Sequence, residues 1–251
     1  MRFSNQSVFI TGAAGGIGSA LVARFLREDA HVYASDIDEA ALRQLAATHE
    51  TSALEIVPLD ITDRALVSSK IETCWQNNPL DVLVNNAGWD TPVQFIDSEP
   101  SVWEKLVSIN LIGPLNLQHA VVPRMVERGR GKVVNIASDA GRVGSSGEAV
   151  YSACKGGIIA FSKSLAREVA RAGVQVNTVC PGPTDTALLR DFAGEGEYGQ
   201  KIFDGLKRAI PMRRLGQPED LAGAVAFLAS EDADFVTGQT ISVSGGLTMH
   251  G

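Results

Sequence analysis

Cysteine, histidine and aromatic residues are scarce in this sequence of 251 residues. It has three cysteines and four histidines, and aromatic residues make up only 6%. Cys74, Cys154 and Cys180 lie far apart, without the Cys-x-x-Cys or Cys/His spacing of a zinc site. We therefore expect no metal and no disulfide framework. Each cysteine is interpreted as a small buried hydrophobic residue in a reducing, cytoplasmic environment.

Positive charge and long hydrophobic runs are also lacking. Lys and Arg number 22 against 29 Asp and Glu, which gives a formal net charge of −7. Nucleic acids and anionic membrane surfaces both attract clustered Lys and Arg, so the sequence predicts neither as a partner. It contains no apolar stretch of about 18 residues that could span a bilayer. Its first residues do not resemble a signal or transit peptide.

Short runs of Val, Ile and Leu alternate with longer helical patterns along the whole chain. Strands are expected at residues 7–11, 31–35, 54–59, 81–84, 132–136, 174–179 and 239–243. Helices are expected at 17–28, 38–49, 62–76, 99–127, 149–172 and 219–229. Apolar strands separated by helices are typical of βαβ units in a parallel sheet covered on both faces. We predict an α/β fold, a single doubly wound domain over residues 1–251 with about seven parallel strands.

Three local features refine this prediction. Thr62 is expected to cap the helix at 62–76, and the helical stretch at 99–127 should bend near Gly113-Pro114. Residues 186–211 follow a strand and hold four glycines among charged residues. A long insertion of this kind in a regular domain predicts a mobile lid over a substrate site.

A glycine-rich turn, Thr11-Gly12-Ala13-Ala14-Gly15-Gly16-Ile17-Gly18, joins the first expected strand to the first helix. Glycine lets a pyrophosphate approach backbone N–H groups closely, and the helix N-terminus adds a favourable dipole. The strand before and the helix after provide the context that a dinucleotide-binding motif requires. The alternative is a tight turn without a ligand. The expected cofactor contacts are Gly12, Gly15, Gly16, Ile17 and Gly18.

Asp36 ends the second expected strand, 18 residues beyond Gly18. An acidic residue there binds the ribose hydroxyls of NAD and repels the 2′-phosphate of NADP. The alternative role, an N-cap of the following helix, suits Asp38 better. The sequence therefore predicts NAD as the cofactor.

The spacing Thr-Gly-x-x-x-Gly-x-Gly resembles that of the short-chain dehydrogenase/reductase family, and further motifs of that family follow in order. They are Asp60 in Leu-Asp-Ile-Thr, Asn85-Asn86-Ala87-Gly88, Asn110, Ser138, Tyr151-x-x-x-Lys155 and Pro181-Gly182. The resemblance covers essentially the whole chain. It implies a Rossmann-type fold, with a dinucleotide-binding half at about 1–130 and a catalytic half at about 131–251.

The resemblance also implies further contacts with the cofactor. Asp60 would contact the adenine ring, while Thr184 and Thr186 would hold the nicotinamide carboxamide. Thr186 could instead serve only as a helix N-cap. The implied set also includes Ile37, Ile61, Asn86, Ala87, Gly88, Tyr151, Lys155, Pro181 and Gly182.

Tyr151 and Lys155 are four residues apart, so they share one face of a helix. A phenol is a poor base at neutral pH, but a nearby ammonium and the positive nicotinamide favour the phenolate. The family mechanism implies that Tyr151 removes the hydroxyl proton and Ser138 holds the substrate oxygen while hydride passes to the nicotinamide. Lys155 would also hold the ribose, and Asn110 would anchor a water that relays protons.

Four segments, at 85–90, 138–151, 179–189 and 242–251, are similar to family members that oxidise ring β-hydroxyacyl-CoA thioesters in bacterial degradation of alicyclic acids. They imply an acyl-CoA substrate such as 2-hydroxycyclohexanecarbonyl-CoA. Candidate substrate contacts are the apolar Trp89, Val143 and Leu188 and, for CoA phosphates, Arg142, Arg190, Lys207 and Arg208. Glu148 could fix a polar group or simply cap the start of a helix.

Three other functions stay open. They are reduction of 3-oxoacyl groups on an acyl carrier protein, oxidation of a polyol or secondary alcohol, and non-catalytic NAD-dependent redox sensing. Asp36 argues against the first, and the intact set of catalytic residues argues against the last. The resemblance also implies a homotetramer. Its interfaces would use the helices at 99–127 and 149–172, with apolar faces such as Leu111, Leu115 and Phe161, and the C-terminal tail.

Overall fold

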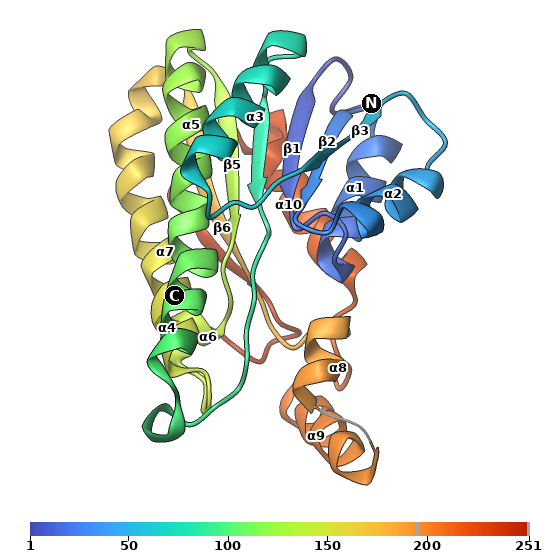
Figure 1. Ribbon diagram of the computed structural model, residues 1–251, viewed down its shortest axis with the longest axis vertical. Helices are drawn as coiled ribbons and strands as arrows, with labels where there is room; N and C mark the ends of the chain where they lie inside the picture. Colours follow the sequence, from blue (N-terminus) through green and yellow to red (C-terminus); the bar gives the residue numbers. More distant parts are fainter. Residues whose placement is uncertain (194–195, 250–251) are drawn as a thin grey trace.

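The computed structural model describes residues 1–193 and 196–249, and its centre is one sheet of seven parallel strands. The strand order is β3-β2-β1-β4-β5-β6-β7 (Figure 1). The strands are β1 (Ser7–Thr11), β2 (His31–Asp36), β3 (Leu54–Pro58), β4 (Val82–Asn85), β5 (Gly131–Ile136), β6 (Val174–Pro181) and β7 (Thr240–Val243). The predicted doubly wound sheet is thereby confirmed.

Helices cover both faces of this sheet. They are α1 (Gly16–Arg27), α2 (Glu39–Ala47), α3 (Arg64–Asn77), α4 (Pro100–Val107), α5 (Gly113–Arg128), α6 (Ala140–Val143), α7 (Ala149–Val169), α8 (Ala187–Ala193), α9 (Gly196–Ala209) and α10 (Pro218–Ala229). One hydrophobic core joins the sheet to α1, α2 and α10, and the other joins it to α3, α5 and α7.

Alternating side chains of each strand supply the two cores. In β1, Val8 and Ile10 enter the core beneath α1 and α10, whereas Phe9 enters the core beneath α3 and α5, and all three are fully buried. A strand buried on both faces has no solvent side, which explains its continuous apolar sequence.

Two predicted helix features differ in detail. The N-cap of α3 is Asp63, whose carboxylate accepts from the Leu66 N–H at 2.9 Å. Thr62 is not the cap, because its hydroxyl donates to Asp60 Oδ1 at 2.7 Å. The predicted irregularity in the long helix is a π turn, Ser108–Ile112, which lies just before Gly113.

The predicted lid segment contains two helices. In Figure 1, α8 and α9 extend together from the carboxyl-terminal edge of the sheet, away from the other helices. Phe192, Ala193, Glu197 and Tyr198 have side chains outside the described set, and residues 194–195 lie outside it altogether. Closure of this pair over a substrate stays a prediction.

The order of the strands places a crevice at one position of the sheet. β1 has β2 on one side and β4 on the other, so the chain reverses its direction of winding there. In open α/β sheets, ligands bind at such a switch point, outside the carboxyl ends of the strands. The described helices include none long and apolar enough to cross a membrane.

Gly18→Ala should destabilise the protein by about 1–3 kcal/mol, because a Cβ at residue 18 would lie 2.0 Å from the Gly12 carbonyl oxygen. Gly205→Ala is the matched control, since a Cβ there meets no atom within 4 Å. The control should be neutral or slightly stabilising. Urea denaturation followed by circular dichroism measures both variants, and equal midpoints would show that the close approach at Gly18 is not important.

Candidate active site

The glycine turn between β1 and α1 has the shape that the motif predicts. Gly12 adopts φ +61°, and a Cβ there would lie 2.8 Å from Ala87 Cα. Gly15 is the N-cap of α1. Because glycine has no side chain that could accept from the first N–H groups of the helix, these groups are available to an anion. Gly15 and Gly16 are exposed, and Ile17 is half-buried. This cradle fits a pyrophosphate.

Asp36 lies beside this turn, at the end of β2. Its Oδ2 accepts from the Ala14 N–H at 3.1 Å, and its Oδ1 accepts from the Asp38 N–H at 3.2 Å. Asp38 is the N-cap of α2, with its side chain accepting from the Ala41 N–H at 3.0 Å. The capping alternative therefore belongs to Asp38, and Asp36 is left as the acidic group beside the turn. Ile37 next to it is exposed.

The end of β3 provides a second loop at the same edge. Asp60 Oδ1 accepts from both the backbone N–H and the hydroxyl of Thr62, at 2.8 and 2.7 Å. Ile61 is 7% exposed, and a Cβ at Gly113 would lie 2.5 Å from its Cδ1. Because the Ile61 side chain belongs to the core, only its backbone could contact a cofactor.

The Asn86 loop joins β4 to the glycine turn. Asn86 Nδ2 donates to the carbonyl oxygens of Thr11 and Gly12, each at 3.0 Å. The backbone N–H groups of Asn86 and Ala87 donate to the Thr11 hydroxyl at 3.0 and 3.1 Å. The Asn86 side chain thus holds the two strands of the switch point together, and its amide N–H groups are not free for a ligand.

Gly88 brings the cofactor loop against the catalytic residues. A Cβ at Gly88 would lie 3.1 Å from Asn110 Oδ1 and 3.3 Å from Lys155 Nζ. Loops after β4, the π turn and α7 therefore converge on one point, as the motif order predicts.

The segment after β6 closes the other side of the crevice. Gly182 lies tightly against Ser244, since a Cβ at Gly182 would be 2.7 Å from the Ser244 Cβ. Thr184 is buried, and its hydroxyl donates to the Gly182 carbonyl at 2.9 Å. Thr186 Oγ1 accepts from the Leu189 N–H at 3.3 Å, so Thr186 does cap α8. Thr186 also lies against Gly16, where a Cβ would be 3.0 Å from Thr186 Cγ2.

Tyr151 and Ser138 form the reacting end of the site. Burial raises the pKa of the Tyr151 phenol, and negative charge on Asp90 adds to the increase, while a hydrogen bond with Ser138 acts in the opposite direction. Ser138 Oγ also accepts from the Ala140 N–H at 3.1 Å, which fixes the serine at the start of α6.

Lys155 is 3% exposed, and its Nζ donates to the Ile136 carbonyl at 3.1 Å and lies 5.5 Å from the centre of the Tyr151 ring. Burial lowers the pKa of Lys155 to about 8. The ammonium is therefore the positive charge that faces the phenol from one turn along α7.

Asn110 is fully buried in the π turn. Its Nδ2 donates to the carbonyls of Trp89 and Leu106 at 2.7 and 3.0 Å, and its Oδ1 accepts from the Trp89 N–H at 3.2 Å. Both amide hydrogens are used by the protein, so the side chain fixes the Trp89 loop. A relay water on this amide could bind only at Oδ1.

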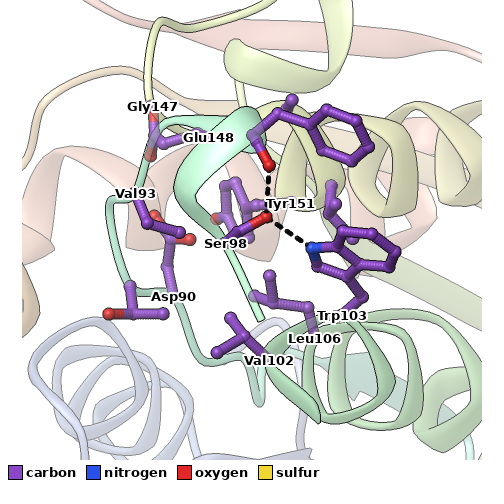
Figure 2. A pocket seen from close by; sticks show the side chains of 13 residues that line it. Asp90, Val93, Ser98, Val102, Trp103, Leu106, Gly147, Glu148 and Tyr151 are labelled. Atoms are coloured by element: carbon purple, nitrogen blue, oxygen red, sulfur yellow. Dashed lines mark hydrogen bonds between the residues drawn. The ribbon is translucent and has the colours of Figure 1, made fainter. Parts of the chain in front are cut away.

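A pocket beside Tyr151 is enclosed by the loop after β4, by α4 and by the start of α7 (Figure 2). Its wall is largely apolar, with Val93, Phe95, Val102, Trp103 and Leu106 among the lining residues. Asp90 and Glu148 line it too. The sequence motifs did not identify Asp90 as a functional residue. The signal that could have identified it is an acidic residue directly after Gly88 and Trp89, in a loop at the carboxyl-terminal edge of the sheet.

Four of the candidate substrate contacts either bond to other residues of the protein or are exposed to solvent. Arg142 donates to Ser242 Oγ at 2.9 Å, and Arg190 pairs with Asp185 at 3.0 Å. Val143 and Leu188 are exposed, at 62% and 45%.

Comparisons with known proteins identify the family of this chain. Residues 12–248 match the family model described as enoyl-(acyl carrier protein) reductase. The chain is 34% identical to 3-oxoacyl-(acyl-carrier-protein) reductase FabG of Thermotoga maritima, over 99% of this chain and 100% of that protein. It is 36% identical to acetoacetyl-CoA reductase of Allochromatium vinosum, over 96% and 98%. It is also 36% identical to 2-keto-3-deoxy-L-fuconate dehydrogenase of Xanthomonas campestris pv. campestris, over 98% and 81%.

Among solved structures, the one described as ElxO with NADP bound has a TM-score of 0.90 and 29% identity, over 96% of this chain and 98% of that chain. The chain belongs to the short-chain dehydrogenase/reductase family. It is an oxidoreductase that acts on hydroxyl or keto groups with a nicotinamide cofactor. The family resemblance is therefore confirmed, whereas the narrower similarity to ring hydroxyacyl-CoA dehydrogenases stays a prediction.

Lys155→Met tests the burial of the ammonium group. Because folding lowers the pKa of Lys155 from 10.5 to about 8, the unfolded chain binds more protons between these pH values. Wild-type stability should therefore rise with pH across this window, and the variant should lose that rise, which is on the order of 1–3 kcal/mol. Urea midpoints from pH 7 to 10 measure the effect. Parallel pH dependences for the two proteins would argue that the lysine is solvated.

Proposed function

We propose that this protein oxidises a ring β-hydroxyacyl-CoA to the ketone with NAD, as a 2-hydroxycyclohexane-1-carbonyl-CoA dehydrogenase does. The apolar pocket beside Tyr151 carries the proposal, because its aliphatic and aromatic side chains suit a hydrocarbon ring next to the reacting carbon. The cavity between these side chains has room for about one water molecule in this structure, so the walls must move apart to admit a ring. Stacked Phe95 and Trp103, with ring centres 5.1 Å apart, form one side of this wall.

The nicotinamide cofactor supplies hydride acceptance when it is bound. Tyr151 removes the proton of the substrate hydroxyl, and Ser138 donates a hydrogen bond to the same oxygen as its charge changes. Lys155 lowers the cost of the phenolate through its positive charge. Asn110 keeps the Trp89 loop in place through hydrogen bonds to the Trp89 backbone.

Asp36 supports NAD rather than NADP. Its carboxylate lies against the glycine turn through Ala14, where a 2′-phosphate would meet its negative charge. The related structure described with NADP bound shows that the fold also accommodates NADP. The choice in this chain therefore depends on the side chains near the end of β2.

The second candidate is reduction of a 3-oxoacyl group carried by acyl carrier protein or CoA. The names of two relatives, 3-oxoacyl-(acyl-carrier-protein) reductase FabG and acetoacetyl-CoA reductase, favour it. The same residues serve both directions, with Tyr151 as the acid in reduction.

A substrate panel separates these candidates. Initial rates with 2-hydroxycyclohexanecarbonyl-CoA, a linear 3-hydroxyacyl-CoA and simple cyclic alcohols, each with NAD⁺ and NADP⁺, should give the largest kcat/KM for the ring thioester with NAD⁺. Equal values for ring and linear thioesters would leave a general hydroxyacyl-CoA dehydrogenase. Activity on free alcohols alone would remove CoA from the proposal.

Tyr151→Phe should reduce kcat by about 10²–10⁴-fold, because the proton acceptor is lost while the ring still fills its space. NADH should bind with nearly unchanged affinity, which fluorescence titration measures. Turnover close to that of wild type would mean that another group acts as the base.

Asp36→Asn should reduce the preference for NAD over NADP by about tenfold or more, which corresponds to about 1.4 kcal/mol. The substitution keeps an oxygen that can accept from the Ala14 N–H and removes only the charge. Asp38→Asn is the matched control, because Asp38 caps α2. An unchanged ratio of kcat/KM values in Asp36→Asn would place the ribose elsewhere.

A further inference from the structure

Two carboxyl groups in the substrate pocket have no part in the mechanism above. Asp90 follows Gly88 and Trp89 in the loop after β4, and Glu148 directly precedes α7. Both line the pocket that Tyr151 lines (Figure 2).

Few structural contacts hold either side chain, apart from a hydrogen bond that the Thr91 backbone donates to Asp90. Glu148 occupies the N-cap position of α7 but makes no side-chain cap bond, so the capping alternative for this residue is wrong. Asp90 Oδ1 is buried without a hydrogen-bond partner. Within the described part of the chain, neither carboxyl forms an ion pair.

Asp90 and Glu148 line the same pocket, so two like charges meet there unless the pair holds a proton. Burial raises the pKa of Asp90 to about 7, and a hydrogen bond and like charge from Glu148 add to the increase. Two carboxylates cannot donate to each other, so this hydrogen bond requires one proton between them. Positive charge on Lys155 acts in the opposite direction, and a charged Asp90 raises the pKa of Tyr151.

Two other polar groups near the pocket are already used. Ser98 Oγ donates to the Phe95 carbonyl at 2.7 Å and accepts from Trp103 Nε1 at 2.6 Å. Lys105 Nζ lies over the Trp89 ring, 3.9 Å from its centre. The carboxyl pair is thus an acidic feature of a largely apolar wall, and a ligand must either bond to it or be repelled by it.

We propose that Asp90 and Glu148 select the substrate by its acyl group: the proton they share is donated to the carbonyl oxygen of a neutral thioester, and a free carboxylate at the same place is rejected. The inference rests on the proposed function and names the part of the substrate that the pair recognises.

The chemistry of a β-hydroxyacyl thioester fits this arrangement. Its carbonyl carbon is separated from the carbinol carbon by one atom, so the two oxygens lie close together in one pocket. With the hydroxyl at Tyr151, the carbonyl needs a nearby donor, and a neutral carboxyl group provides one. A free hydroxy acid would instead bring a second negative charge to a pair that already carries one.

The test compares one acid in two forms, 2-hydroxycyclohexanecarboxylate and its N-acetylcysteamine thioester, so that CoA itself plays no part. Wild-type protein should prefer the thioester by at least about 100-fold in kcat/KM. The double variant Asp90→Asn/Glu148→Gln keeps donors but carries no charge, and its preference should fall at least about tenfold. Asp97→Asn is the matched control, because Asp97 is an exposed acid of the same loop that does not line the pocket.

The pH dependence of kcat/KM gives a second measurement of the same pair. Above about pH 7 the pair loses its shared proton, so the ratio of wild-type to double-variant kcat/KM on the thioester should fall from pH 6 to 8. The single variants Asp90→Asn and Glu148→Gln repeat the measurement if the double variant does not fold.

Turnover of the thioester with equal discrimination in wild type, the double variant and Asp97→Asn would overturn this inference and leave the proposed function intact. A ratio independent of pH would overturn it as well. Wild-type protein that oxidises cyclic alcohols but neither the thioester nor its CoA counterpart would overturn the proposed function, and the inference with it.

Discussion

The contact between the Asn86 loop and the glycine turn is the constraint on which the rest of the site depends. Asn86 and Thr11 tie the ends of β4 and β1 together through four hydrogen bonds of 3.0–3.1 Å. The switch point of the sheet therefore has a rigid floor. Gly88, at the end of the same loop, lies so close to Asn110 and Lys155 that a Cβ there would have to displace their side chains slightly. The loop from Asn86 to Gly88 therefore fixes the position of the glycine turn relative to the catalytic residues.

Buried polar groups govern the chemistry of this site more than exposed charges do. Lys155, Asn110 and Tyr151 each sit inside the protein, where hydrogen bonds have fixed partners and a charge has few screening waters. The opposite pKa shifts of Tyr151 and Lys155 have the same cause, since burial disfavours the phenolate and the ammonium alike. Catalysis then requires a charge of opposite sign beside each group.

The sequence predicted the sheet, most helix boundaries and the convergence of the motif residues, because apolar runs and glycine spacing are local signals. It could not predict that the Asn86 side-chain amide donates to the carbonyl oxygens of Thr11 and Gly12. Nor could it predict that the Ile61 side chain packs against Gly113. Asp63 replaced Thr62 as the cap of α3 because Asp60 competes for the Thr62 hydroxyl. The pairing of Asp90 with Glu148 joins residues far apart in the chain, which no local pattern shows.

The contact of Thr186 with Gly16 has a consequence for protein engineering. Gly16 is the first residue of α1, and Thr186 caps α8. The two residues are in contact, since a Cβ at Gly16 would lie only 3.0 Å from Thr186 Cγ2. A transplant of the α8–α9 segment from a relative, made to exchange one substrate range for another, would therefore carry its junction residue into the phosphate cradle. A bulkier side chain at 186 would press on the glycine turn, so such chimeras should retain threonine or a smaller residue there.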